Sequence, residues 1–196
     1  MPQKPMEDPF DWFTLWLDRA RASDEMEPTA MSLATVGPAG TPTVRIVLLK
    51  DYDRKGFVFY TNLESEKGRH LLAGSAAGLN FLWKTLGWQV RIDGSVEQVS
   101  DDEADAYFAS RPRGSQIGAW ASDQSRPLLD RDTLMVRLKE VEDRFAGQPV
   151  PRPPHWSGFR VIPARFEFWE SGESRLHDRW RFERHGPGWK RERLFP

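Results

Sequence analysis

The first apolar stripe of the chain has helical spacing. Its members recur every three or four residues: Phe10, Phe13, Trp16, Leu17 and Ala20. Asp8 followed by Pro9 is a typical helix start, with the aspartate as N-cap and the proline at the first helical position. The pattern therefore predicts a helix that begins at Pro9 and ends at about Ala22.

Most later segments have the two-residue alternation or the short apolar runs that are typical of strands. Strands are predicted at 30–37, 43–50, 56–61, 79–84, 88–99, 158–169, 175–184 and 188–194, and further helices at 64–73, 101–110 and 130–146. The strand at 56–61 is expected to form a hairpin with 43–50 across residues 51–55. Because strands and helices do not alternate regularly, the predicted fold class is mainly β, an antiparallel barrel or sheet with peripheral helices.

Length and composition narrow the possibilities. The 196 residues contain no long linker, so we expect one domain over 9–196 after a flexible tail at 1–8. Lys and Arg number 28 against 29 for Asp and Glu, and this balance predicts no nucleic-acid partner. The longest uncharged run, 28–44, is rich in Gly, Pro and Thr, so no membrane partner is expected either.

Cysteine is absent, which excludes disulfides, thiolate nucleophiles and cysteine-ligated metals. This composition fits a cytoplasmic location. The four histidines have no metal-ligand spacing, so no metal site is predicted. The chain also contains no glycine-rich phosphate loop, and any nucleotide-type cofactor must therefore be held by side chains on strands.

Charge is unevenly distributed along the chain. Residues 1–36 hold seven acids and three bases, a net charge of −4, and residues 175–196 hold seven bases and three acids, a net charge of +4. The basic segment contains Arg175, His177 and Arg179 at alternate positions, which a strand would place on one face. Two guanidiniums beside an imidazole favour an anion between them, although a solvated edge strand explains the spacing equally well.

Two further groups combine cations with hydroxyls, as phosphate sites do. The first is Tyr107 and Arg111, which share a helix face at spacing i, i+4, with Ser115 beyond the expected helix end. The second group consists of Arg45, Lys50, Tyr60, Thr61 and Lys67. Each group alone fits an ordinary helix end or strand surface. Three such groups in a chain of net charge −1 predict two phosphate-bearing ligands.

Seven segments, in this order along the chain, resemble the pyridoxamine 5′-phosphate oxidase family. They are Arg45–Lys50, Phe59–Asn62, Gln89–Arg91, Tyr107–Ser122, Pro151–Trp156, Phe166–Trp169 and Arg175–Arg179. The likeness extends from about Asp8 to Pro196. It implies an FMN-binding split β-barrel and a homodimer with active sites at the subunit interface.

The resemblance also implies a reaction, the oxidation of pyridoxamine 5′-phosphate or pyridoxine 5′-phosphate to pyridoxal 5′-phosphate. Hydride would pass from the substrate C4′ to the flavin N5, and dioxygen would reoxidise the flavin and give hydrogen peroxide. Two alternatives stay open. One is a related split-barrel flavin oxidase acting on another reduced ring, as in phenazine biosynthesis, and the other is a non-catalytic module that binds flavin or pyridoxal phosphate.

Site residues follow from the resemblance position by position. The substrate would contact Lys50, Tyr107, Arg111, Ser115, Arg175 and His177, and the last two would be catalytic. The FMN cofactor would be held by Arg45, Ile46, Val47, Leu48, Leu49, Lys50, Tyr60, Thr61, Lys67, Gln89, Gln124, Ser125, Trp169 and Arg179. The C-terminal segment 155–196 would complete the active site.

The chain departs from the family pattern in three places. Glu66 occupies a position where arginine is usual, and its carboxylate would repel the FMN phosphate unless it points away. Trp88 occupies another position where arginine is common, with a smaller expected effect. Only residues 1–7 precede the first helix, so a substrate lid is expected to be short or absent.

Overall fold

The computed structural model describes residues 6–74 and 76–196. Helix α1 (Pro9–Arg21) begins as predicted, because an Asp8 carboxylate oxygen accepts a hydrogen bond from the Phe10 N–H at 2.8 Å. Most of the expected flexible tail, residues 1–8, lies outside the described residues. Of the part inside, Asp8 is the helix cap and the Met6 carbonyl accepts a hydrogen bond from Arg191 at 3.1 Å.

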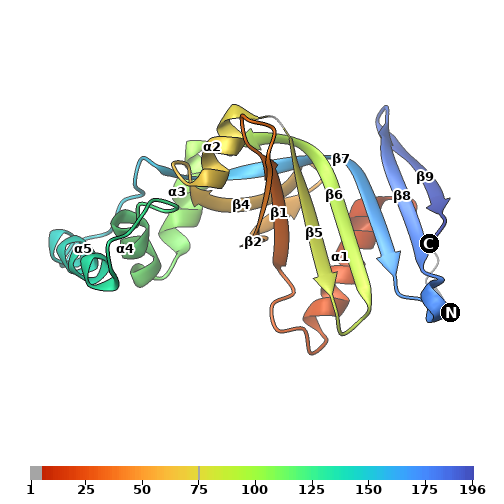
Figure 1. Cartoon of the computed structure of the whole chain (residues 1–196), viewed down its shortest axis with the longest axis horizontal. Helices are drawn as coiled ribbons and strands as arrows, with labels where there is room; N and C mark the ends of the chain where they lie inside the picture. Colours follow the sequence, from red (N-terminus) through yellow and green to blue (C-terminus); the bar gives the residue numbers. More distant parts are fainter. Residues whose placement is uncertain (1–5, 75) are drawn as a thin grey trace.

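Nine strands of the described chain form one antiparallel sheet, in the order β2-β1-β5-β6-β7-β4-β3, and β8 and β9 extend from β7 (Figure 1). The strands are β1 (Ala30–Val36), β2 (Pro42–Leu48), β3 (Asp51–Asp53), β4 (Gly56–Asn62), β5 (Ala76–Trp83), β6 (Trp88–Gln98), β7 (Trp156–Glu170), β8 (Asp178–His185) and β9 (Gly188–Leu194). The predicted fold class, a mainly β split barrel with peripheral helices, is confirmed.

Strand β7 is the long central element of the sheet. Its first half pairs with β4 and its second half with β8, whereas β6 pairs with its other edge from Phe159 to Glu170. Opposite Asp93 and Gly94 of β6 the register shifts by one residue, because Ala164 is the extra residue of a bulge that bends β7. A Cβ at Gly94 would lie 1.9 Å from the Ile162 carbonyl oxygen, so only glycine permits this close approach of the two strands.

Helix α1 closes the inner face of the sheet. Its stripe is buried as predicted, and the ring of Trp12 stacks on Phe168 at 4.3 Å while Trp16 stacks on Trp88 at 4.4 Å. Trp88, one of the departures from the family pattern, is therefore a core residue, 8% exposed. Phe168 on β7 belongs to the same core as Trp88 on β6, and this shared core fixes the path of the two strands.

Four more α-helices of the described residues lie around the sheet: α2 (Glu66–Ala73), α3 (Asp101–Ser110), α4 (Arg113–Ala121) and α5 (Arg131–Arg144). Figure 1 shows α3, α4 and α5 gathered at one end of the molecule, and β8 and β9 at the other. A second apolar cluster holds the helical end together, with Phe108, Ile117, Phe145, Val150 and Trp156 buried in it.

The structure corrects three expectations. The expected hairpin between 43–50 and 56–61 is wrong, because β2 pairs with β1, and β4 pairs with β3 and β7. Strand β8 begins at Asp178, later than the predicted 175, because residues 173–175 form a short 3-10 helix. Helix α4 was not predicted at all. None of the described helices is long and apolar enough to cross a membrane.

Candidate active site

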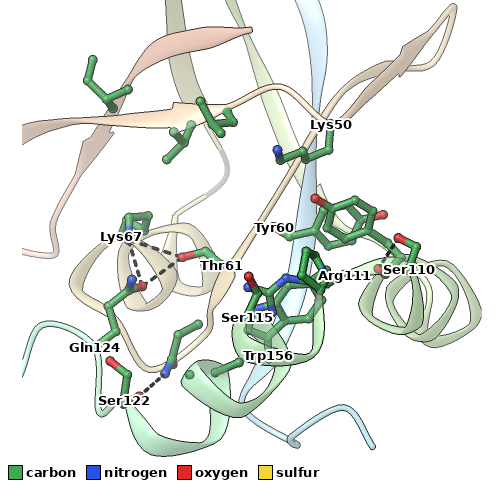
Figure 2. Close-up of a pocket in the computed structure, with 18 residues that line it drawn as sticks. Lys50, Tyr60, Thr61, Lys67, Ser110, Arg111, Ser115, Ser122, Gln124 and Trp156 are labelled. Atoms are coloured by element: carbon green, nitrogen blue, oxygen red, sulfur yellow. Dashed lines mark hydrogen bonds between the residues drawn. The ribbon is translucent and has the colours of Figure 1, made fainter. Parts of the chain in front are cut away.

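A cavity of about 810 Å³ opens between β2, β4 and the helices α2, α3 and α4 (Figure 2). Many of the residues predicted from the sequence line it: Ile46, Val47, Leu48, Lys50, Tyr60, Thr61, Lys67, Tyr107, Arg111, Ser115 and Gln124. Two of the three basic groups seen in the sequence therefore meet at one site, although long stretches of chain separate their members.

Lys67 forms one end of this cavity (Figure 2). Its ammonium donates hydrogen bonds to Thr61 Oγ1 at 3.3 Å and to Gln124 Oε1 at 3.1 Å. Burial lowers the pKa of Lys67, and the neighbouring Arg45 lowers it further. A half-buried cation among hydrogen-bonding side chains at the start of α2 is suited to an anionic group such as a phosphate.

Three stacked aromatic rings form the opposite wall of the cavity. The ring of Tyr60 lies 4.0 Å from Tyr107 and 5.3 Å from Trp156, and each pair is within 10° of parallel. A Cβ at Gly158 would lie 2.7 Å from the Tyr60 ring, so this glycine makes room for the stack. Burial raises the pKa of Tyr60 to about 12 and raises that of Tyr107, so both phenols keep their protons.

Arg111 lies against this wall, beside Ser115 in Figure 2. Its guanidinium carbon is 4.8 Å from the centre of the Trp156 ring, which places the cation over the aromatic face. Among the described residues, its Nη1 is buried without a hydrogen-bond partner, and no carboxylate forms an ion pair with it. Burial lowers the pKa of Arg111. A desolvated, unpaired guanidinium is a binding site for an anion.

Arg45 does not line the cavity. Its guanidinium donates to the hydroxyls of Thr35 at 2.7 Å and Thr43 at 2.6 Å, and it pairs with Glu66 at 3.2 Å. These bonds tie β2 to β1 and α2. The Glu66 carboxylate thus points toward Arg45, and the role of Arg45 as a cofactor ligand stays a prediction. The neighbouring Leu49 is buried in the core rather than in the cavity wall.

A second cluster of predicted residues lies at the far end of β7. Gln89 on β6 and Arg179 on β8 are the strand partners of Trp169, one on each side. The ring of His177 lies 4.5 Å from that of Trp169. Arg179 donates to Glu167 at 2.8 Å and to the Phe195 carbonyl at 3.0 Å, so its charge is partly compensated within the chain.

The expectation that Arg175, His177 and Arg179 share one strand face is wrong. Only Arg179 lies on β8, and Arg175 ends the 3-10 helix that precedes the strand. Ser174 and Arg175 have φ angles of 52° and 64°, in the left-handed region that residues other than glycine rarely adopt. Such backbone strain costs about 1–3 kcal/mol per residue and often occurs at functional sites. Arg175 is exposed in this turn.

Gln89, Trp169, His177 and Arg179 are not among the residues that line the cavity. Trp156 lines the cavity, and Trp169 lies at the other end of β7, about 40 Å away along the strand. Ser125, another predicted residue, does not line the cavity and follows Gln124 with a φ of 71°. Sequence reasoning assigned no role to Trp156, although its segment was among those that carry the resemblance.

Two family models match most of the chain. Residues 19–145 match the model described as pyridoxamine 5′-phosphate oxidase, and residues 156–196 match the pyridoxine 5′-phosphate oxidase C-terminal dimerisation region. The chain is 57% identical to the pyridoxine/pyridoxamine 5′-phosphate oxidase of Myxococcus xanthus strain DK1622, over 96% of this chain and 92% of that protein. It is 55% identical to the protein of the same name from Gluconobacter oxydans, over 96% and 94%.

Among solved structures, PhzG from Burkholderia lata 383 in complex with tetrahydrophenazine-1-carboxylic acid has a TM-score of 0.93 and 32% identity, covering 100% of this chain and 97% of that chain. An FMN-binding protein of Nostoc punctiforme, related to pyridoxamine 5′-phosphate oxidase, shares the fold with a TM-score of 0.76 and 17% identity. The two family models and the curated relatives agree in name and extend over nearly the whole chain. The chain belongs to the pyridoxamine 5′-phosphate oxidase family.

Proposed function

We propose that this chain oxidises pyridoxamine 5′-phosphate or pyridoxine 5′-phosphate to pyridoxal 5′-phosphate, with FMN as its cofactor. The observation that carries the proposal is the pair of cationic groups in one cavity, Lys67 at one end and Arg111 at the other. Both are half-buried cations with lowered pKa, and both lack a carboxylate partner among the described residues. Two phosphate-bearing molecules in contact would supply the two missing anions.

The Lys67 end fits FMN. Lys67, Thr61 and Gln124 offer an ammonium, a hydroxyl and an amide within hydrogen-bond distance of one another, a set suited to phosphate and ribityl oxygens. The exposed apolar side chain of Ile46 and the neighbouring Leu48 line the same cavity and suit a flat aromatic ring. When bound, FMN supplies a ring that accepts a hydride and passes the electrons to dioxygen, which becomes hydrogen peroxide.

The other end fits the phosphate of the substrate. Arg111 supplies charge-assisted hydrogen bonds, and Tyr107 and Ser115 supply hydroxyls. Lys50 follows the end of β2, lies above the aromatic wall in Figure 2, and lines the same cavity as Lys67 and Arg111. Its ammonium would lie where the two ligands meet.

The Trp169 cluster would complete the active site from a second copy of the chain. The dimerisation region at residues 156–196 supports a homodimer, and the same region carries Trp169, His177 and Arg179. Edge strand β2 exposes the apolar side chains of Val44 and Ile46, 65% and 64% accessible, as a surface that a second copy would cover. In this arrangement Arg175 and His177 of one copy would contact the substrate held by Lys50 and Arg111 of the other.

The roles of Arg175 and His177 follow from their charge and position. The Arg175 guanidinium would lie over the substrate ring and hold it against the cofactor, and the His177 imidazole would accept or donate a hydrogen bond at the reacting carbon's substituent. The substrate loses a hydride and a proton in all. With the amine substrate, water enters and ammonia leaves.

Anaerobic absorption spectroscopy tests the proposal directly. The purified holoprotein should lose its flavin absorbance when pyridoxamine 5′-phosphate is added without oxygen, and should regain it with hydrogen peroxide in air. Flavin that stays oxidised at saturating substrate would refute the oxidase. Bleaching by a reduced phenazine precursor alone would favour an activity like that suggested by the name of the Burkholderia structure. Tight binding without peroxide would favour a binding module.

Mixed dimers test whether the active site is shared between copies. Arg111→Met should disable the cavity half and His177→Gln the other half, so each homodimer should be almost inactive. Unfolding and refolding the two variants together should restore roughly a quarter of the wild-type activity, because half of the dimers are mixed and each has one intact site. If the mixture stays as inactive as its parts, each copy supplies its whole site.

A further inference from the structure

The turn from Gly172 to His177 connects β7 to β8 and carries both of the residues proposed to be catalytic. Its first residue makes a hydrogen bond across the turn: the Gly172 N–H donates to His177 Nδ1 at 3.2 Å. A ring nitrogen that accepts a hydrogen bond carries no proton. The neutral imidazole therefore has its proton on Nε2, and this backbone bond selects the tautomer.

Gly172 also lies where the turn has no room for a side chain. A Cβ at this position would lie 2.0 Å from the Leu176 carbonyl oxygen and 3.2 Å from the His177 nitrogen. The obstructing atoms belong to the backbone, so a side chain would displace the segment that carries His177. The φ of Gly172 is −119°, which any residue adopts. Space, not backbone conformation, is the reason for glycine here.

Two other features fix the same imidazole. The Trp169 ring lies 4.5 Å from it on the β7 side. The left-handed φ angles of Ser174 and Arg175 close the turn so that Leu176 and His177 come back toward Gly172. The position of His177 thus depends on the close contact between Gly172 and Leu176, which only glycine permits. The hydrogen bond from the Gly172 N–H determines which ring nitrogen of His177 is protonated.

We propose that Gly172 is a positioning residue for His177: its N–H fixes the Nε2–H tautomer of the imidazole, and its missing side chain lets the turn hold the ring beside Trp169. The inference rests on the proposed function for the role of His177 in catalysis. The geometry of the turn is testable without any turnover.

Histidine NMR tests the tautomer in the full-length holoprotein. The chain has four histidines, so labelling the imidazole nitrogens gives few signals, and loss of one signal in His177→Gln assigns His177. At alkaline pH, His177 should give the Nε2–H pattern in the wild type and a mixed pattern in Gly172→Ala. His155 is an internal control, because its Nε2 lies 3.0 Å from the Ala119 carbonyl far from this turn. An unchanged His177 signal in Gly172→Ala would overturn the inference.

Single-turnover reduction of the flavin tests the consequence. Gly172→Ala should slow reduction by about tenfold or more, because small displacements of a catalytic group are costly, and should leave FMN affinity within twofold. Gly188→Ala is the matched control, since a Cβ there meets nothing within 4 Å, and its rate should be that of the wild type.

A double variant separates positioning from general damage. In a His177→Gln background, adding Gly172→Ala should cause little further loss, because the residue acts through the imidazole. An undiminished tenfold loss in that background would refute the inference. If the wild-type protein reduces no flavin while the NMR result holds, the proposed function fails and the role of Gly172 in fixing the imidazole stands.

Discussion

Replacing Arg111 with methionine should separate the function of this side chain from its contribution to the fold. In the free protein the guanidinium stacks on Trp156 at 4.8 Å, and its buried Nη1 has no partner among the described residues. Methionine keeps an unbranched side chain against the ring and removes the charge. Loss of the cation–π contact lowers the free energy of unfolding by about 0.5–1 kcal/mol, whereas removal of an unsatisfied buried donor raises it by about 1–3 kcal/mol.

These values predict opposite effects on stability and activity. The free energy of unfolding should stay constant or rise by up to about 2.5 kcal/mol, which raises Tm by up to roughly 5–10 °C in a chain of this size. Binding of a phosphorylated substrate should lose one charge-assisted contact of about 1.5–3 kcal/mol. At 1.36 kcal/mol per factor of ten, kcat/KM should fall about 10- to 150-fold.

The assay compares two substrates in the same variant. Arg111→Met should lower kcat/KM for pyridoxamine 5′-phosphate, and should leave the slow reaction of unphosphorylated pyridoxamine within about twofold, because only the phosphorylated molecule uses the charge. Arg144→Met is a matched control: Arg144 stacks on Trp120 at 4.9 Å, and neither residue lines the cavity.

Two results would refute this reasoning. An equal loss of kcat/KM for both substrates would mean that Arg111 supports the site as a whole and does not bind the phosphate. A fall in Tm of several degrees with kcat/KM intact would mean that the cation over Trp156 is structural.

Two other predictions concern the charges around the cavity. Glu66→Gln should tighten FMN binding about two- to fivefold in a fluorescence titration, because the negative charge of Glu66 acts on Lys67. The effect is limited because the Glu66–Arg45 ion pair is partly exposed to solvent. An unchanged Kd would show that Glu66 does not act on the phosphate. Tyr60→Phe should reduce the loss of stability between about pH 10 and pH 12, measured by urea unfolding. Burial raises the pKa of Tyr60 to about 12 in the folded chain, so the unfolded chain loses its proton first and wild-type stability falls as the pH rises through this window; equal slopes in the two proteins would contradict this.

The sequence determined those elements whose burial repeats with a local period. The stripe of α1 and the alternation of β6 were predicted because each reports one buried face, whatever covers it. One group of candidate binding residues was also predicted from the sequence, because Tyr107, Arg111 and Ser115 lie within one short segment. All three line the cavity. The resemblance added the family, which the family models and the curated relatives confirm.

Only the tertiary structure decided which elements pair and where backbone strain lies. The partner of β4 could not be predicted because Phe57, Val58 and Phe59 are all buried, so the strand has no alternation to indicate its neighbours. Helix α4 contains Gly114 and Gly118, which lower its intrinsic helix propensity by about 1 kcal/mol each relative to alanine. Packing of the helical cluster outweighs that cost.

The same distinction applies to the site. A period of two placed Arg175 on a strand with Arg179, but the turn is set by the close contact of Gly172 with Leu176 and by two left-handed residues. These contacts depend on the folded conformation of the backbone, and they leave no periodic pattern of apolar and polar residues in the sequence. The sequence by itself determined which chemical groups the chain carries and which faces it buries. The tertiary structure decided their partners, because strand pairing joins residues that are distant in sequence and the strained turn depends on backbone conformations that no periodic pattern encodes.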